Sequence, residues 1–141
     1  MTQPVKSRLR GLWTPIRLLI LDEISMVGAE LLHNLNSRLN KVMDIPTDSS
    51  TCFGGIPIVA VLGDFNQFDP VGDEALWFPA TTYGKDNKPR HQSEERRLGK
   101  EVWAQFDKTI ILTQSMRQSG DPSYQAFLES CLLYTSPSPR D

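Results

Sequence analysis

Three short apolar runs occur along the chain, at residues 16–21, 56–62 and 109–112. Polar residues follow each run. In the first run Leu18 to Leu21 are consecutive, which is typical of a strand buried on both faces of a parallel sheet. The second run also predicts a buried strand, in which Pro57 is tolerated only near the start. We therefore expect three strands.

Between the strands the apolar spacing changes to steps of three and four residues. Residues 26–43 predict an amphipathic helix, because one face collects Leu31, Leu32, Leu35, Leu39, Val42 and Met43. Residues 101–107 predict a short helix, and residues 122–129 a terminal helical piece. Residues 44–55 are rich in turn-forming side chains and predict a loop. The stretch from 63 to 100 is mostly polar, with Trp77 and Phe78 as its expected anchor on the core.

Strand, helix, strand, helix and strand in this order predict an α/β domain with a parallel sheet. We expect an irregular lead-in over residues 1–15, one partial domain over 16–130, and a separate tail over 131–141. The tail reads CLLYTSPSPRD and resembles translated adaptor DNA from sequencing libraries. The alternative is a native Ser/Pro-rich terminus.

Composition limits the function classes. The 141 residues carry 15 Lys+Arg against 17 Asp+Glu, which excludes a generally basic DNA-coating protein but not a local cationic groove. No apolar run approaches the roughly 18 residues of a membrane span, and acidic residues interrupt the first run too early for a signal peptide. Two cysteines make neither a disulfide framework nor a metal set. We expect an intracellular protein.

The first strand ends at Asp22 and Glu23. An apolar strand followed by Asp-Glu is the Walker B arrangement of P-loop ATPases. Asp22 would hold Mg²⁺ through water, and Glu23 would orient and deprotonate the attacking water. Taken alone the motif is weak, because a solvated strand end often carries acidic residues.

Gln67 follows the second strand and Arg117 the third. The glutamine side chain can both donate and accept, which suits contact with a γ-phosphate and the lytic water together. The arginine could reach a transferring phosphoryl group as an arginine finger. Each has a simpler reading, as part of a surface loop or as a solvated charge. Because ligands bind outside the carboxyl ends of parallel strands, these positions are the best site candidates.

The order of the motifs LDEISMV, GDFNQFDPV and LTQSMRQ resembles the PIF-type helicases, in the RecD-like branch of superfamily one, and most of all fungal and Helitron-associated members. The resemblance covers about residues 8–130. It implies a partial RecA-like P-loop NTPase domain, ATP as substrate, Mg²⁺ as cofactor, and 5′-to-3′ unwinding by the full-length enzyme.

The resemblance also implies residue roles. Asp22 matches the Mg²⁺ aspartate and Glu23 the catalytic base of motif II. Gln67 matches the motif III glutamine that couples nucleotide state to DNA contacts, and Arg117 the motif IV arginine that contacts the γ-phosphate. Ser25 and Met26 would complete the motif II turn, and Asp64 would support the motif III loop. The chain departs from the family at Asp69, which replaces the first proline of QFPPV.

No G-x-x-x-x-G-K-[ST] phosphate loop occurs in the sequence, and motifs V and VI are absent too. We therefore expect the Walker A portion to be missing, half a catalytic site to be present, and the isolated chain to be inactive. The alternative is a catalytically dead, transposon-derived remnant. An independent nucleotide-binding module is a third reading, which the lack of a phosphate loop argues against.

For the full-length enzyme the resemblance implies single-stranded and duplex DNA as partners, a monomeric state and no membrane association. It also implies a role in DNA repair, recombination and telomere maintenance. The compartment that we expect is the nucleus, and the alternative is the mitochondrion. A single-strand groove needs cationic side chains, and the candidates are Lys85, Lys88, Arg90, His91, Arg96 and Arg97. The alternative is a charged solvated loop.

Overall fold

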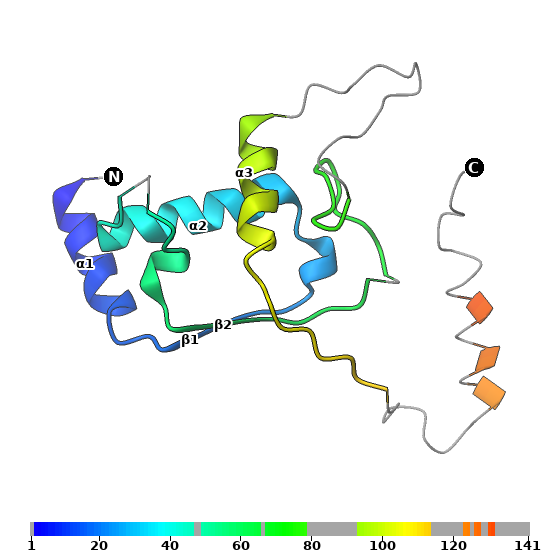
Figure 1. Ribbon diagram of the computed structural model, residues 1–141. Helices are drawn as coiled ribbons and strands as arrows, with labels where there is room; N and C mark the ends of the chain where they lie inside the picture. The colour runs from blue at the N-terminus through cyan, green and yellow to red at the C-terminus, as the bar shows by residue number, and fades with distance from the viewer. Residues whose placement is uncertain are drawn as a thin grey trace.

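The computed structural model describes residues 2–46, 49–65, 67–78 and 93–113, with 123–124, 126–127 and 130–131. The elements run in the order α1 (Gln3–Trp13), β1 (Leu18–Leu21), α2 (Ala29–Met43), β2 (Ile58–Val61) and α3 (Glu94–Trp103) (Figure 1). Short 3₁₀ turns occur at Ile24–Met26 and Phe53–Gly55. The described residues of the predicted terminal helical piece are helical.

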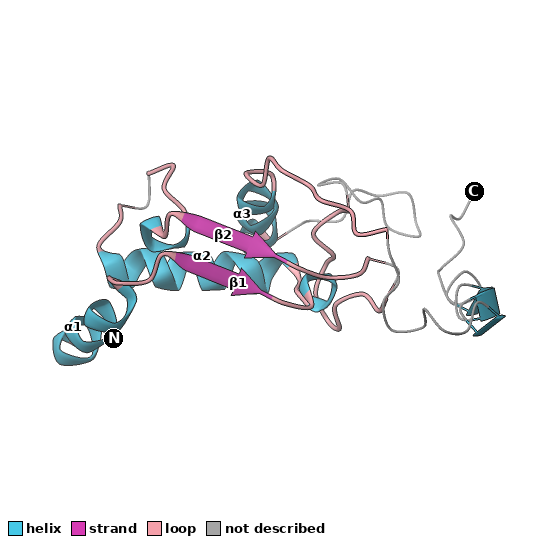
Figure 2. Cartoon of the chain, turned by 90° about the horizontal axis from the view of Figure 1, so that it is seen from below, coloured by secondary structure: helices cyan, strands magenta, loops and turns pink. Residues whose placement is uncertain are grey.

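β1 and β2 form a parallel pair, in which Leu18 lies opposite Ile58 and Leu21 opposite Val61. Both arrows point the same way in Figure 2, and α2 lies behind them. The first two predicted strands and the α/β class are therefore confirmed. A parallel connection needs a crossover, and α2 supplies it.

The third predicted strand is wrong for the described structure. Residues 109–112 form no regular secondary structure and pair with no strand in the described part of the chain. The side chains of Ile110, Ile111 and Leu112 are 80% to 88% exposed. A strand needs a neighbour to satisfy its backbone N–H and C=O groups, and neither of the two described strands pairs with this segment.

Only one face of the sheet is covered among the described residues. Leu19, Leu21, Val59 and Val61 pack against the core. The side chains of the opposite face, Leu18, Ile20 and Ile58, are 49% to 58% exposed. Burial of β1 on both faces was therefore a wrong prediction here, because α2 and α3 lie on the same side of the sheet.

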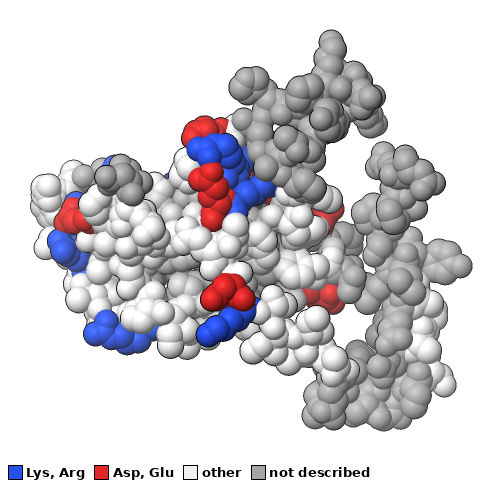
Figure 3. All heavy atoms as spheres, viewed as in Figure 1, with Lys and Arg blue, Asp and Glu red and all other residues white. Residues whose placement is uncertain are grey.

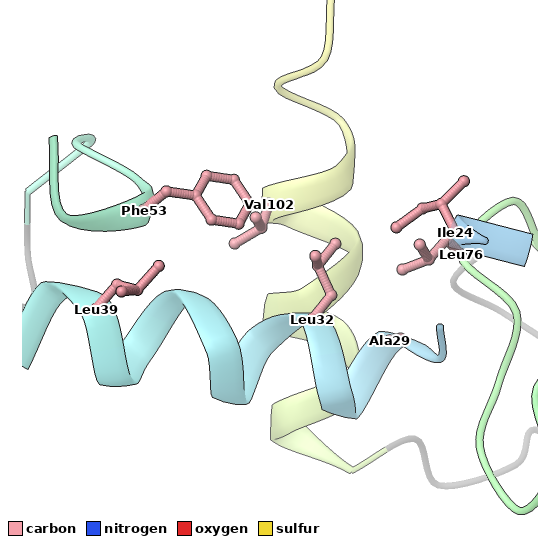
Figure 4. Packing of buried hydrophobic residues seen from close by; sticks show 7 residues of the cluster. All are labelled: Ile24, Ala29, Leu32, Leu39, Phe53, Leu76 and Val102. Atoms are coloured by element: carbon pink, nitrogen blue, oxygen red, sulfur yellow. The ribbon is translucent and has the colours of Figure 1, made fainter. Parts of the chain in front are cut away.

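The core lies between α2, α3 and the sheet. Figure 4 shows Leu32 and Leu39 of α2 pointing toward Val102 of α3 and toward Phe53. The cluster consists of Ile24, Ala29, Leu32, Leu39, Phe53, Leu76 and Val102. The amphipathic helix is confirmed, although it begins at Ala29 and leaves Leu31 57% exposed.

α3 begins earlier than the helix predicted over residues 101–107. The Ser93 hydroxyl accepts a hydrogen bond from the Arg96 backbone N–H at 3.4 Å, and two glutamates occupy the first turn, where the helix dipole favours negative charge. Arg97 pairs with Glu94 and Glu101, and its hydrogen bond holds the pKa of Glu94 below the ordinary value. Because of these local contacts the helix begins at Glu94, seven residues before the start that the apolar pattern alone predicts.

The lead-in over residues 1–15 is not irregular, because α1 occupies Gln3–Trp13. Pro4 lies in the first turn, where a missing N–H costs nothing. Lys6 and Arg10 both form ion pairs with Asp44 at the end of α2. The hydrogen bond from Lys6, with the two positive charges, lowers the pKa of Asp44. This tertiary contact is what the local sequence does not reveal.

Candidate functional site

The carboxyl ends of β1 and β2 lie side by side, and hydrogen bonding continues past both strands. The Leu62 backbone N–H donates to the Leu21 carbonyl at 2.8 Å, and the Ile24 N–H donates to the Leu62 carbonyl at 2.8 Å. The exit loops are therefore held together. This register places Asp22 and Glu23 next to the start of the loop that follows β2.

Glu23 is held in the left-handed backbone region, at φ 53° and ψ 43°. For a residue other than glycine this conformation costs about 1 kcal/mol or more, and such strain gathers at functional sites. One carboxylate oxygen of Asp22 accepts the Glu23 backbone N–H at 2.9 Å, which orients the aspartate. Both acidic residues are exposed. The turn therefore presents two adjacent carboxylates to solvent.

Gly63 allows the two exit loops to approach each other. A Cβ atom at this position would lie 2.9 Å from both the backbone nitrogen and the Cγ2 atom of Ile24. Its φ is not positive, so the position requires space rather than conformational freedom. Beneath this contact Ile24 is 1% and Ser25 0% exposed. The hydroxyl of Ser25 has no hydrogen-bond partner among the described residues.

Gln67 lies on the same edge of the sheet, in the loop after β2. Its backbone N–H donates to the Asp64 carbonyl at 3.1 Å, and the residue is exposed. Asp69, which departs from the motif, is exposed as well. The exit loops of adjacent strands thus carry Asp22, Glu23 and Gln67. Arg117 lies outside the described residues, so its place at this edge stays a prediction.

Aromatic packing anchors the loop after β2. The Phe65 ring meets Trp77 edge-on at a centroid distance of 4.7 Å and Trp103 of α3 at 6.1 Å. Leu76 is 2% exposed, whereas Phe78 is 43% exposed. The predicted anchor at Trp77 and Phe78 is therefore correct only for Trp77, which packs against the core, and Leu76 is the buried residue.

Sequence reasoning missed a further contact, between the loop after β2 and the start of α2. A carboxylate oxygen of Asp73 accepts the backbone N–H groups of Glu30 at 2.9 Å and Leu31 at 3.2 Å. The other oxygen lies 3.3 Å from the Arg96 Nε. The partners are 42 and 43 residues apart from Asp73, so no local pattern announces them.

The described side chains at this edge could supply only some of the ligands of a divalent cation. The described residues contain no group of three or more His, Cys, Asp or Glu side chains that could hold a metal ion. Mg²⁺ commonly binds one or two carboxylates and takes its other ligands from water and phosphate oxygens. The exposed carboxylate of Asp22 fits that role.

Two of the predicted DNA-binding cations are engaged in ion pairs. Arg96 lies against Asp73 and Glu30, and Arg97 against two glutamates of its own helix. Figure 3 shows blue and red side chains side by side over α3. This pattern differs from the uncompensated stripe expected of a nucleic-acid groove. The other candidates, Lys85, Lys88, Arg90 and His91, lie outside the described residues.

The fold and the strand ends define a class: a partial α/β domain of the RecA-like type, with acidic residues at the carboxyl end of its sheet. Residues 3–129 match the PIF1-like helicase family, and the chain belongs to that family. None of the helices in the described ranges has the length and apolar character that crossing a bilayer requires.

Curated relatives agree with this assignment. The chain is 44% identical over 112 residues to the ATP-dependent DNA helicase PIF1 of Candida albicans, and 32% identical over 112 residues to that of Saccharomyces cerevisiae. It is 32% identical over 107 residues to the S. cerevisiae helicase RRM3. The matches cover 75% to 79% of this chain but only 11% to 12% of the relatives. No solved structure matches the chain significantly.

Proposed function

We propose that this chain supplies the Walker B, motif III and motif IV residues of an ATP-dependent DNA helicase that unwinds in the 5′-to-3′ direction. The observation that carries the proposal is the parallel pair of strands, whose joined exit loops present Asp22, Glu23 and Gln67 at one edge. That edge is where ligands bind in open α/β sheets.

Each residue then has a defined task. The Glu23 carboxylate accepts the proton of the attacking water, and its strained turn holds it at the surface for that purpose. The Glu23 N–H fixes one oxygen of Asp22, so the other can bind a hydrated Mg²⁺. The cation supplies charge neutralisation for the phosphates. Gln67 reports the state of the nucleotide to the loop after β2, and Arg117 contacts the γ-phosphate.

A P-loop ATPase also needs a phosphate-binding loop, and this sequence contains no such string. We therefore expect the 141-residue chain by itself to show no Mg²⁺-dependent ATP hydrolysis. Turnover by the chain that Glu23→Gln abolishes would contradict this expectation.

The activity is testable in a chimera in which residues 3–129 replace the matching segment of the Candida albicans relative. We expect DNA-stimulated ATPase activity and unwinding of duplexes that carry a 5′ overhang. Glu23→Gln should lower kcat by about 10²-fold or more, the usual contribution of a general base. Glu95→Gln is the matched control, because this exposed glutamate belongs to α3 and to neither of the loops that follow the strands. We expect it to leave kcat unchanged.

The chimera also separates the proposal from its rival. A folded chimera that melts like the parent enzyme but hydrolyses no ATP would identify the segment as an inactive remnant. An active chimera in which Glu23→Gln has no effect would instead refute the role of Glu23 while leaving the family assignment intact.

A further inference from the structure

We infer that Asp73 is a positioning residue, which fixes the loop carrying Gln67 against the turn carrying Asp22 and Glu23. The inference rests on the proposed function, because it concerns how the parts of that same site are held together. Asp73 itself lies two residues beyond the motif GDFNQFDPV, and it acts through the backbone at the start of α2.

The first step is the cap that Asp73 places on α2. One of its carboxylate oxygens accepts the N–H groups of Glu30 and Leu31, at 2.9 Å and 3.2 Å. The residue at the N-cap position itself, Gly28, has no side chain to do this. The first turn of α2 therefore receives its side-chain cap from a segment more than forty residues further along the chain.

The second step is the backbone contact that the cap accompanies. The Ala29 N–H donates to the Glu74 carbonyl at 2.9 Å, and Gly28 forms an antiparallel bridge with Ala75. A Cβ atom on Gly28 would lie 2.1 Å from the Asp73 carboxylate oxygen and 2.3 Å from the Asp73 Cβ. Asp73 thus occupies the space in which any other residue at position 28 would place its side chain.

The third step is the anchoring of Asp73 by α3. Arg96 lies 3.3 Å from its second carboxylate oxygen, and Lys100 pairs with Glu74 at 2.9 Å with only 9% and 15% of the side chains exposed. The loop after β2 is therefore fastened at both ends. It is fixed at Leu62, next to the catalytic turn, and again at Asp73, with Gln67 between the two points.

The consequence for the site is geometric. Five residues separate Glu23 from Ala29 at the start of α2, and Asp73 holds the far end of this segment. If the cap is lost, the loop with Gln67 and the turn with Glu23 can move relative to each other. A misplacement of about 1 Å between reacting groups can cost on the order of 100-fold in rate.

The first test uses the 141-residue chain and needs no activity. We expect Asp73→Ala to speed hydrogen exchange of the Glu30 and Leu31 amides and of residues 63–78. Asp73→Asn keeps an acceptor oxygen and caps helices as well as Asp does, so it should preserve most of the protection. Asn40→Ala is the matched control, because it removes two hydrogen bonds between the last turn of α2 and residues 51–54 and leaves both Asp73 and Arg96 in place. Unchanged exchange of residues 63–78 in Asp73→Ala overturns the inference.

The second test uses the chimera described above. We expect Asp73→Ala to lower kcat for DNA-stimulated ATP hydrolysis by about tenfold to 100-fold, with the KM for ATP unchanged. Gly28→Ala, which displaces Asp73 from the opposite side, should reproduce this effect. Asn40→Ala, which removes two hydrogen bonds at the other end of α2, should also lower the Tm but leave kcat unchanged.

The outcomes distinguish the two proposals. An inactive unmodified chimera counts against the proposed function, and the exchange experiment then decides the role of Asp73 independently. An active chimera in which Asp73→Ala and Asn40→Ala lower kcat equally refutes positioning, because loss of stability alone would then explain both. If Asp73→Asn has a kcat as low as that of Asp73→Ala, the hydrogen bonds from the Glu30 and Leu31 amides are not what positions the site.

Discussion

Replacing Gly99 with alanine tests the close crossing of α3 over the start of α2. In an exposed helix this change is stabilising by about 1 kcal/mol, because alanine has the higher helix propensity. At Gly99 the new Cβ would lie 1.8 Å from the Ala29 carbonyl oxygen and 2.6 Å from its carbon. Comfortable contacts between such atoms are about 3.5 Å, so α3 must move by roughly 1.5 Å.

That movement separates Val102 from Leu32, two residues of the buried cluster. A clash with backbone on this scale costs about 3 kcal/mol, the upper end of the usual overpacking penalty. Subtracting the gain in propensity leaves a net destabilisation of about 2 kcal/mol. Small domains are stable by only about 5–15 kcal/mol, so this loss is large enough to measure.

Urea unfolding followed by tryptophan fluorescence and far-UV circular dichroism provides the assay, and the chain contains its own control. Gly11 lies in α1 with no atom within 4 Å of the Cβ position. We expect Gly11→Ala to stabilise the chain by about 0.5–1 kcal/mol. The two substitutions should therefore change stability in opposite directions. A Gly99→Ala variant as stable as the parent chain would refute the reasoning.

Two further predictions concern charge and burial. The pKa of Asp44 is lowered by Lys6 and Arg10, so its stabilising contribution is present above the ordinary carboxyl pKa of about 3.9 and is lost as the pH falls below it. Asp44→Asn should therefore flatten the dependence of Tm on pH in that acid range, and an unchanged pH profile would contradict this. Ser25→Ala removes a fully buried hydroxyl without a partner in the described ranges and should stabilise the isolated chain by about 1 kcal/mol, measured by urea unfolding. A loss of stability would show that the hydroxyl is hydrogen-bonded.

The parts of the fold that the sequence predicts correctly are those with a local signal. The apolar runs identify β1 and β2, and the leucine spacing identifies α2, because these patterns follow directly from which side is buried. The start of α3 is missed, although Ser93 and the two glutamates after it are a recognisable cap. Residues 109–112 show the opposite error, because an apolar run predicts a strand only where a partner strand is available.

Contacts between residues far apart in the sequence are the part of the fold and of the site that the sequence does not predict. The position of α1 depends on Asp44, and the contact between the two exit loops depends on Asp73, each more than thirty residues from its partner. The carboxylates and Gln67 could be proposed from motif order alone. The joined exit loops, the strained turn and the space at Gly63 could not, because no spacing in the sequence encodes the distance between two loops.

The left-handed backbone of Glu23 has an evolutionary consequence. Glycine adopts this conformation without penalty and asparagine with little, so replacing Glu23 by either should make the chain more stable. If the carboxylate has its proposed role, activity and stability favour different residues at this position. We therefore expect relatives that no longer hydrolyse ATP to carry glycine or asparagine at this position more often than active ones do.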